Sequence, residues 1–174
     1  SILLLQTVGG DCPEDMSLLA GDDCLERGLG FALPKTGAVR AFLNRFHDEE
    51  IELARPPREV QKSFIMPSRQ PVQGLQAVLA GGVRRTAKLY AEQGQALRIA
   101  TVDQDATIIE SHKEKALTHY EGGRGYQPMV AVWAEADLVV ADEFRDGNVP
   151  AKQAPLTCAQ AAFAALPARV QERY

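Results

Sequence analysis

The sequence predicts a protein of the α+β or α/β class, with a helical first part and a strand-forming second part. Before Gly94, apolar residues recur with three-and-four spacing between helix start and stop signals. After Gly94, runs of β-branched and aromatic residues are separated by turn residues. With 45% hydrophobic and 24% charged residues, the chain has the composition of a globular protein that buries a core.

Residues 1–53 are expected to form short helices. Residues 13–20 have acids early and leucines late, as a short helix does. Asp22 or Asp23 is a suitable N-cap for a second helix that ends near Gly28 or Gly30.

A third helix is expected from Lys35 to about His47, opened by Pro34. One buried stripe is expected at Val39, Phe42, Leu43 and Phe46. The basic side chains between these positions are Lys35, Arg40 and Arg45. Short helices, a glycine-containing link and a basic helix indicate either a DNA-contacting helix-turn-helix-like unit or a plain helical packing module.

Residues 54–95 are interpreted as a proline-containing linker followed by a basic helix. Four prolines between Ala54 and Pro71 exclude one long regular helix, so this segment is expected to be either a linker or a segment wrapped over the surface. A helix is expected over 72–93, weakened or kinked at Gly81-Gly82. Its expected apolar stripe is Leu75, Val78, Leu79, Val83 and Ala87, and its basic residues are Arg84, Arg85 and Lys88.

Residues 96–174 are expected to form strands and one helix. Strands are predicted over 96–102, 126–134 and 138–144, the last two joined as a hairpin, with a glycine loop at 121–125. Alanine-rich residues 155–166 are expected to be helical and to stop at Pro167. Trp133 is expected in the core, and Cys158 is interpreted as a core residue rather than a nucleophile.

Charge is distributed unevenly along the chain. Residues 1–34 have one basic residue against six acidic ones, residues 35–98 have eleven against six, and residues 99–174 have seven against eleven. A basic middle between acidic flanks suggests a phosphate-facing surface next to a carboxylate-rich one. The alternative interpretation is that these charged residues lie on helix faces exposed to solvent.

Other features of the sequence indicate the cellular location of the protein and the extent of the chain. Three cysteines without a close pairing favour reduced thiols over a disulfide framework. The sequence contains no apolar run as long as a membrane span and does not open on a signal segment, so we expect a cytoplasmic location. Since the chain opens on Ser1 and closes at Tyr174 without a final element, we interpret both ends as cuts in a longer protein.

Asp103 and Asp105 interrupt the apolar run from Ile99 to Glu110. Residues two apart on a strand project from one face, where two like charges repel each other. Such a pair indicates either a solvent-facing strand end or a site for a hard divalent cation. A two-metal centre needs at least three carboxylates. The candidates to join the pair are Glu110, Glu114, Asp142, Glu143 and Asp146.

Other site chemistries lack support in the sequence. His112 and His119 are seven residues apart with no cysteine nearby, which argues against a zinc site. The sequence has no nucleophile elbow of a serine hydrolase and no phosphate-binding glycine loop of the P-loop kind.

Seven segments of the chain are similar to segments of one known family and follow one another in the same order. They are Asp22–Leu25, Leu33-Pro34, Arg40–Leu43, Phe46–Glu49, Thr101–Glu114, Tyr120–Pro128 and Glu143–Pro150. Together they resemble the DDE transposases of bacterial insertion sequences, in particular the group numbered thirteen-eighty, and Thr101–Glu114 resembles the first catalytic strand of that family. The resemblance covers most of the chain, and its order makes it more specific than any single segment.

The resemblance implies a ribonuclease-H-like fold, begun by three antiparallel strands and a helix and incomplete in this chain. It implies that Asp105, followed by a small residue and Thr107, is the first metal-binding aspartate, with Asp103 as a second-choice ligand or electrostatic neighbour. The family's second aspartate lies on the strand after the helix over 155–166, and its glutamate lies far beyond. We therefore expect two of three catalytic carboxylates to be absent from this chain, which reaches only Tyr174.

The resemblance further implies Mg²⁺ or Mn²⁺ in the complete parent protein, double-stranded DNA of the element's terminal repeats as partner, and association with the bacterial nucleoid. The expected DNA-binding residues are Lys35, Arg40, Arg45, Arg84, Arg85, Lys88, Arg124 and Arg145.

Three functions stay open at this point. The chain is a fragment of a transposase that cuts and joins DNA by two-metal phosphoryl transfer, a non-catalytic DNA-binding remnant of one, or another metal-dependent nuclease of similar fold. The strand over 96–102 is expected to present an unpaired edge, from which we expect self-association.

Overall fold

The computed structural model describes residues 2–174. Contacts between residues divide the chain into two compact units, the first extending to Glu49 and the second running from Glu50 to Tyr174. The segment over 54–95 belongs to the same compact unit as the strands that follow it. Each unit is described separately below.

The first unit consists of short helices. These are α1 (Ile2–Thr7), the 3-10 turn η1 (Pro13–Asp15), α2 (Met16–Leu19), α3 (Asp23–Leu29) and α4 (Thr36–Asn44). The side chain of Asp22 accepts hydrogen bonds from the backbone N–H groups of Cys24 and Leu25, both at 2.9 Å, and Gly30 ends α3 at a φ of +77°. The predicted cap and stop of this helix are therefore confirmed.

The predicted buried stripe of α4 is mostly wrong. Val39 is buried with Leu5, Met16 and Leu33 in a small cluster. Phe42 and Leu43 are exposed, and Phe46 is only half-buried. The rings of Phe42 and Phe46 meet edge to face at 5.2 Å, so they partly cover each other rather than enter the cluster.

The second unit combines three α-helices and two 3-10 turns with short strands. Its helices are α5 (Glu49–Ala54), which begins at the boundary between the units, the 3-10 turn η2 (Arg58–Val60), α6 (Gln70–Glu92), the 3-10 turn η3 (Ala134–Ala136) and α7 (Pro155–Ala165). Its strands are β1 (Ile99–Ala100), β2 (Val102–Ala106), β3 (Ile109–Glu110), β4 (Leu117–Thr118), β5 (Arg124–Tyr126), β6 (Met129–Trp133), β7 (Leu138–Glu143) and β8 (Glu172–Arg173). The fold is therefore mixed α and β, as predicted.

The main sheet has the strand order β2-β6-β7, and both pairs of neighbours are antiparallel. Asp105 lies opposite Val130 on β6, and Val130 lies opposite Asp142 on β7. Strand β1 precedes β2 directly and pairs in parallel with β8, with Ala100 opposite Arg173. A second small sheet, in the order β3-β5-β4, is formed by the excursion between β2 and β6.

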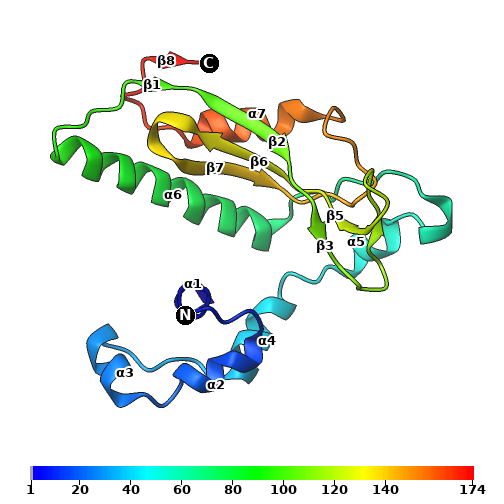
Figure 1. The fold of residues 1–174 in the computed structure, drawn as a ribbon, viewed down its shortest axis with the longest axis horizontal. Helices are drawn as coiled ribbons and strands as arrows, with labels where there is room; N and C mark the ends of the chain where they lie inside the picture. The colour runs from blue at the N-terminus through cyan, green and yellow to red at the C-terminus, as the bar shows by residue number, and fades with distance from the viewer. Residues whose placement is uncertain (1) are drawn as a thin grey trace. The chain divides into compact units, whose positions relative to one another are not determined.

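The core of the second unit lies between the main sheet and the two long helices. Helix α7 packs against β6 and β7, and α6 packs against β7 and α7. Figure 1 shows α7 behind the sheet and α6 running along β7. Trp133 is fully buried, as predicted, and its Nε1 donates a 3.0 Å hydrogen bond to the carbonyl of Ile99. Cys158 on α7 is also buried in this core.

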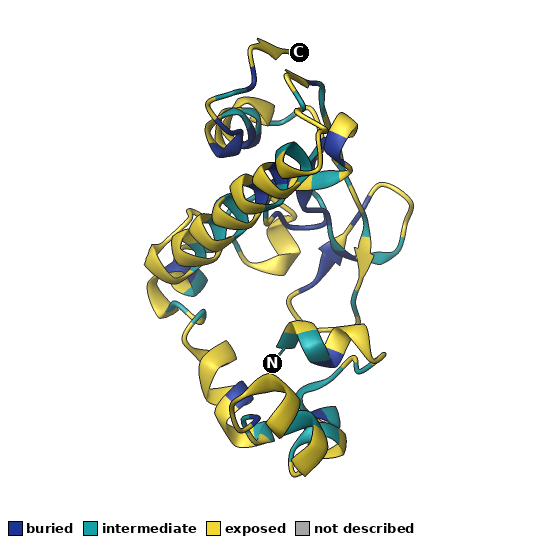
Figure 2. Ribbon diagram, turned by 90° about the vertical axis from the view of Figure 1, so that its left-hand side faces the viewer, coloured by how far each residue is buried: buried dark blue, intermediate teal, exposed yellow. Residues whose placement is uncertain are grey.

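Helix α6 buries less of its surface than its apolar spacing predicts. Val83 and Ala87 are buried, but Leu75 is half exposed and Val78 is 72% exposed. Figure 2 shows the resulting exposed flank along the helix. Gly81 and Gly82 lie within one continuous helix, so the predicted weakening there does not end the element.

A strap formed by residues 55–65 contacts the turn that follows β7. Ile65 forms a β-bridge with Arg145. Ser63 Oγ donates to the carbonyl of Asn148 at 3.1 Å, and Asn148 Nδ2 donates to the carbonyl of Gln61 at 2.8 Å. These bonds fix the turn over 145–148 from one side.

The expected unpaired edge over 96–102 is wrong, because β8 occupies it. The N–H of Tyr174 donates to the carbonyl of Ala100, and the N–H of Val102 donates to the carbonyl of Tyr174, both at 2.9 Å. Strand β8 begins at Glu172. Among residues 2–174, β2 pairs only with β6 and is therefore an edge of the main sheet, as β7 is on the other side. Self-association through the edge of β2 stays a prediction.

Candidate functional site

A cavity of about 490 Å³ with mixed polar and apolar walls opens beside the end of β2. The residues that line it come from the end of β2, the loop after β4, the junction between β5 and β6, and the turn after β7. They are Asp105, Ala106, Thr118, His119, Tyr120, Gln127, Gly147, Asn148, Pro150 and Ala151. Three of the segments quoted for the family resemblance, Thr101–Glu114, Tyr120–Pro128 and Glu143–Pro150, therefore meet at one cavity.

Asp105 is exposed at this cavity. One of its carboxylate oxygens, Oδ1, accepts a 2.8 Å hydrogen bond from the N–H of Ala106, while Oδ2 has no bond within the protein. Asp103 is exposed as well, consistent with one strand face for both aspartates, but it does not line the cavity. Of the two aspartates predicted as metal ligands, only Asp105 therefore lines the cavity.

The five carboxylates considered as further ligands do not line the cavity either. Asp146 is fully buried and bound by Arg55, and Glu143 is bound by Arg145. Asp142 lies two strands from Asp105, and its partial burial raises the pKa of its carboxyl. Glu110 and Glu114 are exposed outside the lining. Asp105 is therefore the one carboxylate of the described lining.

Three polar side chains at the cavity were missed by the sequence analysis. His119 and Gln127 are each only 4% exposed, and both ring nitrogens of His119 are buried without a hydrogen-bond partner. The Oδ1 atom of Asn148 is also buried without a partner. Burying a polar group without a hydrogen bond costs about 1–3 kcal/mol, so these side chains distinguish the cavity from an ordinary surface hollow.

Glycines hold the walls of the cavity together, which explains why the glycine-rich segments surround it. A Cβ on Gly123 would lie 2.6 Å from Nε2 of His119. A Cβ on Gly147 would lie 2.5 Å from the carbonyl oxygen of Gly125, and one on Gly125 would collide with the carbonyl of Ile109. The chain segments approach too closely at these three points for any larger residue.

Tyr120 is exposed at the rim of the cavity. The carboxylate of Glu121 raises the pKa of its phenol, and partial burial and the carboxylate of Asp105 act in the same direction. The rim of the cavity near Tyr120 is therefore negatively charged. No lysine or arginine lines the cavity, so its charge does not favour a free anion.

Two of the predicted DNA-binding arginines have structural roles instead. Arg145 is fully buried and binds Glu143 and the carbonyls of Gln153 and Ala154, so its guanidinium cannot meet a phosphate. Arg124 donates to three carbonyls of the loop before β4, those of Lys113, Glu114 and Ala116. The prediction for Arg145 is wrong because the turn closes around it.

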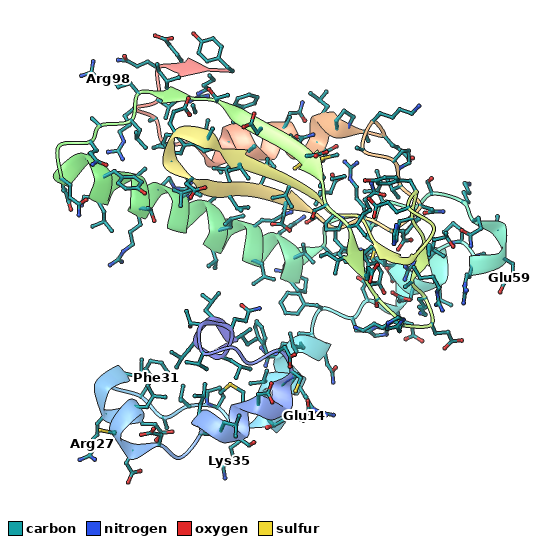
Figure 3. All side chains as sticks on the ribbon, in the orientation of Figure 1. Glu14, Arg27, Phe31, Lys35, Glu59 and Arg98 are labelled. Atoms are coloured by element: carbon teal, nitrogen blue, oxygen red, sulfur yellow. The ribbon has the colours of Figure 1, made fainter. Side chains whose placement is uncertain are left out.

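The remaining predicted DNA-binding residues are exposed. Arg40 forms an ion pair with Glu14, and Lys88 lies 3.7 Å from Glu92. Lys35, in the first unit, points away from the helices around it in Figure 3, and Arg45 is exposed at the end of α4. In the second unit, Arg84 and Arg85 are exposed on α6.

Asp11, Cys12 and Asp15 form the one cluster of at least three potential metal-ligating groups among residues 2–174. The carboxylate of Asp15 accepts hydrogen bonds from the N–H groups of Asp11 and Cys12, which lower its pKa. These bonds cap η1, so the cluster has a structural explanation.

No helix of the described residues is both long and apolar enough to cross a membrane. Comparison of the chain with protein-family models, curated proteins and solved structures finds no match.

Proposed function

We propose that this chain provides part of a DNA-cutting and DNA-joining centre of the DDE transposase kind, with Asp105 as its first metal-ligating carboxylate. The observation that carries the proposal is the position of Asp105. It lies near the carboxyl end of β2, an edge strand of the antiparallel main sheet, and its carboxylate lines the cavity.

The strand order supports this proposal. Three strands in the order β7-β6-β2 are antiparallel, and α7 then leads from β7 to β8, which pairs in parallel with β1. A ribonuclease-H-like domain, as implied by the family resemblance, begins with three antiparallel strands followed by a helix and further strands. We therefore assign the second unit to the first part of such a domain.

The donor set at the cavity fits Mg²⁺ or Mn²⁺ better than zinc. Asp105 offers a hard carboxylate oxygen, and the amide side chains of Gln127 and Asn148 stand nearby. His119 is the one zinc-type ligand of the described lining, which has no second histidine and no cysteine to complete a zinc site. When bound, such an ion supplies a Lewis acid for phosphoryl transfer. The hydrogen bond from Ala106 fixes one oxygen of Asp105 and leaves the other for a cation.

The same geometry limits what the chain does alone. A two-metal centre requires at least three carboxylates, and the described lining contributes only Asp105. We therefore propose that these 174 residues by themselves neither cleave nor join DNA. Metal-dependent nicking of supercoiled DNA that persists through purification and disappears in Asp105→Ala would contradict this.

Metal binding tests the assignment of Asp105 directly. A titration of the full chain with Mn²⁺ is expected to show one weak site that is lost in Asp105→Asn. Asp103→Asn is expected to weaken binding less, because Asp103 does not line the cavity. Glu59→Gln is the control, since Glu59 is exposed on η2 and points outward in Figure 3. Unchanged binding in Asp105→Asn would contradict the assignment.

Non-catalytic DNA binding is the second candidate, favoured by the exposed arginines of α6 and consistent with a nucleoid-associated location. Each phosphate contact contributes about 0.9 to the slope of log affinity against log salt concentration. We expect Arg84→Ala together with Arg85→Ala to reduce this slope by up to about 2. The second candidate would be excluded if the chain did not bind element-end DNA, or if its binding did not depend on the salt concentration.

A further inference from the structure

Besides Asp105, Gln127 is one of the polar side chains that line the cavity. It is 4% exposed and makes no side-chain hydrogen bond within the protein. A buried amide with two donors and one acceptor needs partners. The cavity beside it is the place where a partner can bind.

The backbone holds Gln127 firmly at this place. Its N–H donates a 3.1 Å hydrogen bond to the carbonyl of Arg145, whose side chain is locked within the turn. The carbonyl of the next residue, Pro128, accepts a 3.0 Å hydrogen bond from the N–H of Thr107, two residues after Asp105. Asp105 and Gln127 are thus fixed on adjacent chain segments at one cavity.

The charge and size of the cavity restrict what it can bind. Its lining has one carboxylate and no lysine or arginine, which disfavours a free anion, and its buried polar side chains disfavour an apolar ligand. The volume of about 490 Å³ is large for a bare ion. Six waters occupy roughly 180 Å³ as liquid, so a hydrated cation fits with room to spare.

We propose that Gln127 is a positioning residue that holds the water shell of a divalent cation bound at Asp105. Mg²⁺ and Mn²⁺ bound by few carboxylates keep several of their waters, and these waters need hydrogen-bond partners. The amide of Gln127 supplies such a partner without adding a second charge. This inference rests on the proposed function, because it takes Asp105 as the direct ligand.

The test is a titration of the full chain with Mn²⁺, in which electron paramagnetic resonance counts the free ion. Gln127→Leu, which keeps the size of the side chain, is expected to weaken binding about threefold to tenfold, the effect of one lost hydrogen bond. Gln127→Glu is expected to tighten binding, because a carboxylate in the same place adds attraction for the cation. A folding defect cannot produce that gain. Gln160→Leu, at an exposed position of α7, is the control and is expected to change nothing.

The outcomes separate the two proposals. If Asp105→Asn binds Mn²⁺ as the unmodified chain does, the proposed function fails. If Asp105→Asn loses binding but both Gln127 variants bind as the unmodified chain does, only the role of Gln127 fails. The number of waters on bound Mn²⁺, measured by electron–nuclear double resonance, is expected to stay the same in Gln127→Leu. A gain of one water would show direct ligation by Gln127 and would overturn the water-mediated role.

Discussion

The guanidinium of Arg55 binds the fully buried carboxylate of Asp146 through two of its nitrogens, one of them at 3.1 Å from Oδ2. The two residues lie 91 positions apart in the sequence, and their pairing fastens the strap over 55–65 to the turn after β7. Burial raises the pKa of Asp146 even though Arg55 opposes that shift. The pair therefore stabilises the turn that carries Gly147 and Asn148 into the cavity wall.

Asp146→Asn is expected to destabilise the protein by about 3–5 kcal/mol, because it leaves the charge of Arg55 buried without its partner. Chemical denaturation monitored by circular dichroism measures this change. The matched control is Glu50→Gln, which breaks the exposed Glu50–Arg69 pair and is expected to cost less than about 1 kcal/mol. Equal effects of the two substitutions would show that Arg55 is solvated when unpaired.

Substitution by alanine is expected to have opposite effects on stability at two glycines. Gly147→Ala is expected to cost about 1–3 kcal/mol, because its Cβ would overlap the carbonyls of Gly125 and Leu117. Gly81→Ala is expected to stabilise the chain by about 0.5–1 kcal/mol, since Gly81 lies inside α6 with nothing within 4 Å of the added atom. Thermal unfolding of both variants measures the difference. A stable Gly147→Ala would contradict the close approach.

Local signals in the sequence were sufficient for several elements of the fold. The cap at Asp22, the helix from Pro155 and the core location of Trp133 each depend on residues close in the sequence or on one large apolar side chain. Helix spacing was less reliable for burial. It identified Val83 and Ala87 but also Val78, which is exposed, because the neighbours of a helix are not encoded in its own period.

The cavity could be predicted only in part. The strand pattern indicated Asp103 and Asp105 together, and only the family resemblance singled out Asp105. Gln127 and His119 were not predicted to line a cavity, because the sequence does not show whether a polar residue is buried. Arg145 was assigned to DNA for its charge alone, although it is buried in the turn by partners within ten residues. The pairing of Arg55 with Asp146 requires the whole fold to be known, since the residues are far apart in sequence.

Glu135 is expected to contribute to the stability of the folded state in a pH-dependent way. Its carboxylate accepts hydrogen bonds from the N–H and the hydroxyl of Thr101 at 2.8 and 2.7 Å. Burial acts to raise its pKa, but the bonds from Thr101 outweigh it and the pKa is lowered. The folded state therefore binds the proton less tightly than the unfolded state. The stabilisation is present above the unfolded pKa of about 4.3 and is lost as the pH falls through the lower folded pKa.

Glu135→Gln is accordingly expected to be less stable than the unmodified chain at pH 7, by about 1 kcal/mol or less because the carboxylate is exposed. The difference is expected to shrink at pH 3. Urea denaturation of both proteins at the two pH values measures it, with Glu59→Gln as the control. A difference that grows on acidification would contradict the sign.

The thiols are expected to react in an order set by burial. Cys24 is exposed on α3, whereas burial raises the pKa of Cys158 to about 11. Because the thiolate is the reactive form, Cys158 at pH 8 has only about one thousandth of its thiols ionised and is also shielded by the core. Iodoacetamide is expected to modify Cys24 in the folded chain and to leave Cys158 unmodified, and mass spectrometry measures the modification.

The control is the same reaction in denaturant, where both cysteines are expected to react at similar rates. Modification of Cys158 in the folded chain as fast as that of Cys24 would show that α7 detaches from the sheet, and would place the core of the second unit in doubt.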